Sequence, residues 1–262
     1  MMASIASSLR MCRQVAKSLR WGQASTGASI YSSTRHHHDG SSSDPPSDNK
    51  FYEFRTYKIK PASFPEFVKL TNEKMHLRTS HSKLIGYWAT DIGGLNEVVH
   101  IWEYECFAAR KAVRAALAGD QTWQSEYFSK ALQMFEAQEN ASMTLLPWKP
   151  LQDKPFKEGG VYELRQYILQ PKSVELLKPR ILLRDEAYTK LGCGKMVGAW
   201  IGDLGNANMF YHLYSWESAD KRVEARNAVL EMDAFKNLPK CDALTPQMDS
   251  KLLSPLPFSP LQ

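Results

Sequence analysis

Apolar and polar residues begin to alternate at Phe51, and the pattern predicts the first element of a folded unit. Residues 51–59 (FYEFRTYKI) alternate and are rich in aromatic side chains, which is typical of a β-strand. A helix is expected from Ser63, because Ser63-Phe64-Pro65-Glu66 has the form of a capping box with proline in the first turn. Residues 83–90 and 97–104 predict two further strands, and the Gly-Gly pair between them allows the tight turn of a hairpin.

The pattern continues with a second helical region and a last strand. Residues 106–117 are rich in alanine and arginine and predict a helix. Asp120 can cap the helix that follows, whose apolar side carries Trp123, Tyr127, Ala131 and Phe135. Residues 142–146 predict a short final strand. The order is therefore βαββαβ, which is the ferredoxin-like arrangement.

The same sequence pattern occurs twice along the chain. The stretch FYEFRTYKIKP (51–61) returns as VYELRQYILQP (161–171), and later positions recur 112 residues on. These recurring pairs are Gly86 and Gly198, Trp88 and Trp200, Asp91 and Asp203, His100 and His212, Arg110 and Arg222, Arg114 and Arg226, and Trp123 and Phe235. A similarity of this length indicates a duplicated structural unit.

The second copy is expected to be the less regular one. Pro179 should kink its first helix, and Pro239 and Pro246 should break the region after Phe235. The predicted organisation is a presequence and disordered linker in residues 1–48, a first unit in 49–148, a linker in 149–160 and a second unit in 161–262.

A pairing of the two units follows from their exposed faces. Helices cover only one face of a four-stranded antiparallel sheet, yet both faces of the opening strand carry aromatic side chains. We therefore expect an α+β fold in which two tandem ferredoxin-like units pair their sheets face to face, as a pseudo-twofold α/β barrel. Whether the units pair within one chain or between two chains stays open.

The net charge of +5 is confined to the start of the chain. Residues 1–38 hold five basic residues and no acid, which leaves 28 basic against 28 acidic residues in the rest. A neutral body gives no general attraction to phosphate backbones, so nucleic-acid binding is not expected. The serine-rich, amphipathic, basic start predicts a mitochondrial presequence, with a membrane-surface helix as the alternative. No apolar stretch is long enough to predict a transmembrane helix.

Candidate functional residues lie on matching strands of the two copies. Side chains two residues apart share a face of a strand, so each opening strand presents Glu, Arg and Tyr together. If these faces meet inside the barrel, its interior contains Glu53, Arg55, Tyr57, His100, Glu163, Arg165, Tyr167 and His212. One interpretation is a pocket for a small anionic or aromatic molecule. The other is a pair of structural Glu–Arg contacts, which buried polar groups require.

The residues of both copies also carry a family resemblance. The stretches FYEFRTYKIKP, HLRTSHSKLIGYW (76–88) and VVHIWEY (98–104), with the second copy's VYELRQY (161–167) and the closing LPF (256–258), resemble the NIPSNAP family, and its third subgroup most. The resemblance implies a ferredoxin-like unit of the dimeric α/β-barrel type, association with mitochondria, and roles in mitochondrial quality control such as mitophagy or in vesicle-related processes through protein partners. It implies no firmly attached enzyme activity. The second copy departs at LGCGKMVGAW (191–200), which lacks the histidine-containing sequence before Gly86.

Two functional hypotheses follow. The first is a non-enzymatic mitochondrial protein, expected in the matrix with a cytosolic pool left open, that acts by binding other proteins and for which self-association is left open. The second is a carrier of a small ligand or haem, or a monooxygenase-like enzyme, that uses the barrel interior. No nucleotide, metalloprotease or hydrolase motif is present, and we expect neither a metal nor a cofactor. An open cavity beside the Arg and His side chains distinguishes the second hypothesis from the first.

Overall fold

A computed structural model describes residues 50–171, 173–205, 207–239 and 244–262. The predicted presequence and linker of residues 1–48 lie outside the described residues. The elements of the first half are β1 (Phe51–Ile59), η1 (Pro61–Ser63), α2 (Phe64–Thr79), β2 (Lys83–Ile92), β3 (Glu97–Tyr104), α3 (Phe107–Gly119), α4 (Gln121–Trp123), η2 (Gln124–Phe128), α5 (Ser129–Met134) and β4 (Phe135–Leu145). Those of the second half are β5 (Val161–Ile168), α6 (Val174–Lys190), β6 (Gly194–Leu204), β7 (Met209–Trp216), α7 (Ala219–Glu231), α8 (Asp233–Lys236) and β8 (Gln247–Pro255).

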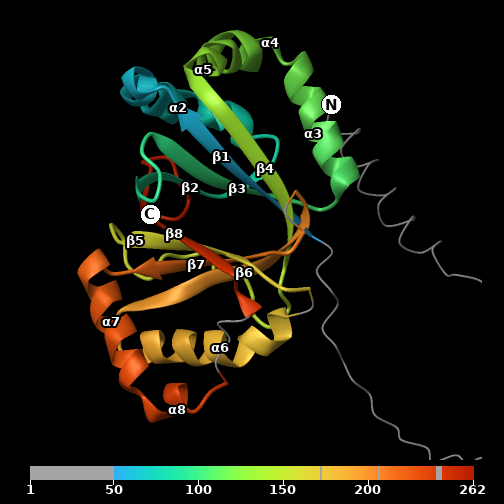
Figure 1. The fold of residues 1–262 in the computed structure, drawn as a ribbon. Coiled ribbons are helices and arrows are strands. Elements are labelled where there is room, and N and C mark those ends of the chain that lie inside the picture. Colours follow the sequence, from blue (N-terminus) through green and yellow to red (C-terminus); the bar gives the residue numbers. More distant parts are fainter. Residues whose placement is uncertain (1–49, 172, 206, 240–243) are drawn as a thin grey trace, which may run out of the picture.

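The eight strands close into one antiparallel barrel within a single chain. Their order is β1-β3-β2-β8-β5-β7-β6-β4, so each half contributes a four-stranded sheet. The two sheets meet at two seams, where β2 pairs with β8 and β4 pairs with β6. Figure 1 shows α2 to α5 outside one sheet and α6 to α8 outside the other. The expected barrel of two ferredoxin-like units is confirmed, and both units belong to the same chain.

The barrel interior is a packed apolar core. It combines side chains of both halves, such as Tyr52 and Phe54 of β1 with Leu164 of β5, and its centre holds the fully buried indoles of Trp88 and Trp200. Such tight packing matches ordinary protein interiors and leaves the barrel centre filled.

A glycine at a β-bulge makes room for each of these indoles. The register shifts between Leu84 and Gly86 on β2, and between Met196 and Gly198 on β6. A Cβ atom at Gly86 would lie 2.2 Å from the ring of Trp88, and one at Gly198 would lie 2.5 Å from the ring of Trp200. The recurrence of both glycines therefore reflects the close approach of an aromatic ring to the backbone.

The expectation that the candidate polar residues face the barrel interior is wrong. Tyr57 packs in the core between the first sheet and its helices, and Tyr167 in the corresponding core of the second half. Their strand neighbours on the same face lie on the helix side too, which places Glu53, Arg55, His100, Glu163, Arg165 and His212 there. The physical reason is that Arg110 on α3 and Arg222 on α7 supply the partners of the two buried carboxylates.

Two local predictions differ from the structure. The first long helix begins after Ser63 as expected, but Ser63 closes a short 3₁₀ turn and its side chain makes no capping hydrogen bond. Asp120 does cap the next helix, since its carboxylate accepts from the backbone N–H of Trp123 at 3.0 Å. That helix contains a π-helical segment at Gln124–Phe128, and β4 begins at Phe135 rather than at residue 142.

The prolines of the second half were predicted to kink its first helix, which stays a prediction, and to break the region after Phe235. Pro179 lies inside α6, which continues beyond it to Lys190. Residues 237–246 form no helix or strand longer than one residue among those described, and β8 begins directly after Pro246.

Candidate functional site

A buried carboxylate organises the polar cluster of the first half. The Oε1 atom of Glu53 accepts hydrogen bonds from Nη2 of Arg110 and from Nδ2 of Asn140, both at 2.6 Å. The Nε atom of Arg55 lies 3.3 Å from the same oxygen. Burial alone would raise the pKa of Glu53, but the Arg110 hydrogen bond and the charge of Arg55 outweigh it and hold the pKa at about 2. The carboxylate is therefore ionised at neutral pH.

The guanidinium of Arg55 links this carboxylate to an aromatic neighbour. Its Nη1 atom donates to the hydroxyl of Tyr57 at 2.6 Å. Burial raises the pKa of Tyr57, so the phenol stays protonated. Because one Arg55 guanidinium contacts both Glu53 and Tyr57, the face-sharing predicted for these three side chains is confirmed.

A third arginine, Arg78, which the repeat pattern did not indicate, lies on α2. Nη2 of Arg78 donates to the hydroxyl of Tyr104 at 2.7 Å, and its guanidinium lies 4.0 Å from the ring centre of Trp102. The position 110 residues further on is Tyr188, so the repeat offers no signal for Arg78.

His100 is held by the same aromatic group. Nε1 of Trp102 donates to its Nδ1 atom at 2.7 Å, and the ring of Tyr87 stacks on the imidazole with centroids 4.3 Å apart. Burial, together with the charges of Arg55 and Arg78, holds the pKa of His100 well below its usual value. The imidazole is therefore neutral at physiological pH.

Two adjoining cavities lie between the first sheet and its helices. The wider one, about 260 Å³, extends from Glu53 and Arg114 to Trp123. The narrower one, about 50 Å³, is lined by His100 and Tyr87. Both share the side chains of Arg55, Tyr57, Arg78, Trp123 and Phe128. Trp123 directly precedes the π-helical segment and Phe128 is its last residue, and such distortions often occur at functional sites.

The second half repeats the carboxylate cluster with similar geometry. Oε1 of Glu163 accepts from Nε of Arg165 at 2.6 Å, from Nη2 of Arg222 at 2.5 Å and from Oγ of Ser250 at 2.9 Å. Burial would raise the pKa of Glu163, but these arginines outweigh it and lower the pKa strongly. Ser250 stands opposite Arg165 on β8, where Asn140 stands opposite Arg55 on β4.

The histidine of the second half has different contacts. The hydroxyl of Tyr167 lies 3.3 Å from Nη1 of Arg165 and 3.3 Å from Nε2 of His212. Ala199 pairs with His212 across the strands, where Tyr87 pairs with His100 in the first half. The repeat therefore preserves the carboxylate cluster and changes the surroundings of the histidine.

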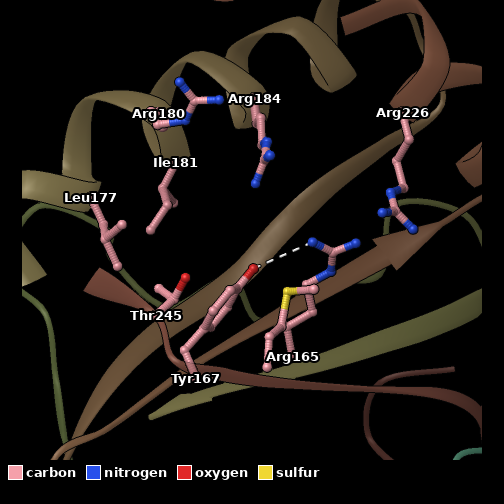
Figure 2. Close-up of a pocket in the computed structure, with 9 residues that line it drawn as sticks. Arg165, Tyr167, Leu177, Arg180, Ile181, Arg184, Arg226 and Thr245 are labelled. Carbon is pink, nitrogen blue, oxygen red and sulfur yellow. Dashed lines mark hydrogen bonds between the residues drawn. The ribbon is translucent and has the colours of Figure 1, made fainter. Parts of the chain in front are cut away.

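An open pocket of about 340 Å³ adjoins the second cluster. Its lining is formed by Arg165, Tyr167, Leu177, Arg180, Ile181, Arg184, Arg226, Thr245 and Met248. Figure 2 shows the guanidinium groups of Arg165, Arg184 and Arg226 turned toward the space above Tyr167, while that of Arg180 is turned away. Arg180 donates to the backbone carbonyls of Leu238 and Pro239, both at 3.1 Å. Three positive groups therefore converge on one cavity.

Neither Arg184 nor Arg226 has a carboxylate partner among the described residues. Arg184 packs its guanidinium 4.8 Å from the ring centre of Phe235. Burial lowers the pKa of Arg226, and repulsion from Arg165 and Arg222 lowers it further. Arg226 was visible in the sequence as the recurrence of Arg114, whereas Arg184 has Lys74 at its matching position.

The described part of the chain contains neither a membrane-spanning helix nor a metal-binding group of three or more His, Cys, Asp or Glu side chains. The fold and the two clusters define a class of tandem α+β barrels with cavities between the sheet and the helices of each half. The NIPSNAP family model matches residues 52–150 and 162–260, so the chain belongs to the NIPSNAP family.

Curated relatives agree with this assignment. The chain is 40% identical to Protein NipSnap homolog 3A of Homo sapiens over 181 residues, which covers 69% of this chain and 72% of the relative. It is 39% identical to the human NipSnap homolog 3B over the same length and with the same coverage. A NipSnap homolog of Dictyostelium discoideum is 27% identical over 211 residues, or 79% of this chain and 88% of the relative.

Solved structures with the same fold include two described as putative monooxygenases. One, from Fusobacterium nucleatum, has a TM-score of 0.56 at 11% identity and covers 79% of this chain and 92% of its own. The other, from Lactobacillus acidophilus, has a TM-score of 0.53 at 15% identity, with 79% and 93% covered. At these identities the likeness shows the fold alone.

Proposed function

We propose that the protein binds a small organic anion in the pocket of its second half. The observation that carries the proposal is the convergence of Arg165, Arg184 and Arg226 on an open cavity of about 340 Å³. The nearby carboxylate, Glu163, already accepts three hydrogen bonds from its neighbours. An anion would supply the missing negative charge.

The electrostatics of Arg226 support this proposal. Its guanidinium is partly desolvated and repelled by Arg165 and Arg222, which is the cause of its lowered pKa. Carboxylates and phosphates fit the planar fork of arginine and form short, charge-assisted hydrogen bonds with it. Binding an anion would therefore relieve the repulsion between the arginines of this pocket.

The apolar side of the pocket indicates the rest of the ligand. Leu177 and Ile181 on α6 and Met248 on β8 line the wall beside Tyr167. The cavity lies within the roughly 300–1,000 Å³ range of ordinary small-molecule sites. An organic anion with a short hydrocarbon part fits both the arginines and this wall better than an inorganic ion.

Calorimetric titration of the full chain with hexanoate and hexyl phosphate tests the proposal. We expect saturable binding that Arg226→Gln weakens at least tenfold. The matched control is Lys190→Gln on the exposed end of α6, which removes one positive charge outside the pocket. The proposal fails if neither probe binds, or if both substitutions weaken binding equally.

A second candidate function is the mitochondrial, protein-binding role that the family resemblance implies, including a part in mitochondrial quality control. The basic, acid-free composition of residues 1–38 supports this location. Val223 and Leu230, both about half exposed and seven residues apart on α7, give that helix an apolar outer face. Imaging of a fluorescent protein fused to residues 1–48 tests the location, and a diffuse signal would contradict it.

A further inference from the structure

The first half contains a buried hydrogen-bond donor whose position is fixed. An indole N–H only donates, so Nδ1 of His100 must accept from Trp102 and carry no proton. The neutral imidazole therefore carries its proton on Nε2. This atom is buried and has no hydrogen-bond partner among the described residues. A buried donor without an acceptor costs free energy unless a bound molecule satisfies it.

A second unsatisfied polar group accompanies this donor. The hydroxyl of Tyr87 is buried and also lacks a partner within the described part of the chain. The stacked rings of Tyr87 and His100 both line the narrow cavity of about 50 Å³. Two polar groups thus border the same small space, which is large enough for a few atoms of a ligand.

Flat aromatic side chains line both this space and the adjoining wider cavity. Trp123 and Phe128 line both cavities, with ring planes only 24° apart. Arg114 lines the wider cavity and the open polar mouth beyond it. No carboxylate lies within ion-pair distance of Arg114 among the described residues. The lining therefore combines a hydrogen-bond donor in the narrow cavity, an aromatic wall along both cavities and, besides the shared Arg55 and Arg78, the positive charge of Arg114 at the mouth.

We propose that the first half is a separate binding site for a flat aromatic acid that carries a hydrogen-bond acceptor opposite its acidic group. The acceptor, such as a carbonyl oxygen, takes the proton of His100 Nε2 in the narrow cavity. The ring lies beside Trp123 and Phe128 in the wider cavity, and the acidic group faces Arg114. This site is separate from the pocket of the second half, and the proposal is independent of the ligand proposed for that pocket.

The second half lacks the features that would make this site a duplicate. Nε2 of His212 is already within hydrogen-bond distance of Tyr167. Ala199 replaces the stacking tyrosine, and Tyr214 occupies the place of Trp102 opposite the carboxylate strand. Nδ1 of His212 is buried without a partner among the described residues, but His212 does not line the pocket of its half, whereas His100 borders the narrow cavity of the first half.

A pair of probes of similar shape tests this inference on the full chain. The probe 4-acetylbenzoate carries a carbonyl oxygen opposite its carboxylate, and 4-isopropylbenzoate has nearly the same shape without that oxygen. We expect the acetyl compound to bind about tenfold more tightly, which is the effect of one buried hydrogen bond that satisfies an orphaned donor. Equal affinities would overturn the proposal and indicate that water satisfies His100.

Substitutions then assign the preference to the histidine. His100→Phe keeps an aromatic ring but removes the donor, so the preference for the acetyl compound should vanish while 4-isopropylbenzoate still binds. His100→Gln places an amide donor near the position of Nε2 and should restore part of the preference. Tyr87→Phe keeps the stacked ring and removes only the second unsatisfied hydroxyl, so it is a milder substitution in case replacement of His100 disturbs the core, and we expect it to reduce the preference for the acetyl compound in part.

Two controls separate this site from the pocket of the second half. Arg226→Gln should leave the preference between the two benzoates unchanged, because Arg226 lies in the other half. Arg114→Gln should weaken the binding of both benzoates alike, because Arg114 faces the carboxylate group that both probes carry. If Arg226→Gln abolishes the binding of both benzoates and Arg114→Gln does not weaken it, the aromatic acid binds in the second half and the inference is wrong.

Discussion

The indole nitrogen of Trp102 donates to Nδ1 of His100 at 2.7 Å, between two side chains on the same face of β3. This bond fixes the tautomer of a histidine that burial keeps neutral. We predict that ¹⁵N NMR of the imidazole will show the proton on Nε2 in the native protein. Trp102→Phe should release Nδ1 and give a mixture of tautomers. Trp148→Phe, which removes an indole elsewhere, should leave the spectrum unchanged.

The two buried carboxylates should make the protein sensitive to acid. Their pKa values are depressed in the folded state, to about 2 for Glu53 and strongly for Glu163. Each therefore adds stability above the unfolded pKa of about 4.3, and this stability is lost as the pH falls from there toward the folded pKa. Urea unfolding of the native protein should show the free energy of unfolding falling steeply below about pH 4.5.

Substitution of one carboxylate should both destabilise the fold and flatten this dependence. Glu163→Gln leaves Arg165 and Arg222 without a buried negative partner, at a cost of about 3 kcal/mol at neutral pH. The exposed Glu224 offers a control, because Glu224→Gln should change stability by less than about 0.5 kcal/mol. An unchanged acid slope in Glu163→Gln would contradict the role of the cluster.

The buried histidines should add a separate dependence at higher pH. Both His100 and His212 have pKa values well below the usual value, first because of burial. Below about pH 6.5 the two histidines bind protons in the unfolded chain but stay neutral in the folded state, so the free energy of unfolding falls as the pH drops. The slope is at most about 1.4 kcal/mol per pH unit for each histidine. His212→Phe should reduce it, whereas His76→Gln at an exposed position should not.

The glycines beneath the central indoles should tolerate no side chain. A Cβ at Gly86 would meet the ring of Trp88 at 2.2 Å, and this ring is enclosed on all sides. We expect Gly86→Ala to lower the free energy of unfolding by about 3 kcal/mol, measured by urea titration. Gly119→Ala serves as the control, because nothing lies within 4 Å of its added Cβ. Equal stability of the two variants would contradict the packing described here.

Much of the architecture could be predicted because the unit occurs twice. The recurrence of strand and helix patterns at fixed offsets gave the order of elements, and the aromatic side chains on both strand faces gave the barrel. The long β4 could not be predicted, since its polar segment at residues 136–141 shows no alternation. Those residues are held in a strand by pairing with β1.

The sequence did not indicate which face of each opening strand points into the barrel and which points to the helices. In β1, Phe51 and Tyr57 lie on one face and Tyr52 and Phe54 on the other, so hydrophobicity does not distinguish the barrel side from the helix side. The recurrence of Arg110 as Arg222 carried the missing information, because a carboxylate paired with a helix must face that helix. The sequence held no comparable signal for Arg184. Its matching residue in the first copy is Lys74, and a basic residue at such a position is typical of an exposed helix surface.

Closure of the barrel within one chain has a consequence for symmetry. A barrel built from two identical chains would carry every substitution in both pockets at once. Here β2 and β6 are encoded separately, so Tyr87 could stack on one histidine while Ala199 stands beside the other. The barrel can thus keep its shared architecture while the surroundings of each histidine change independently.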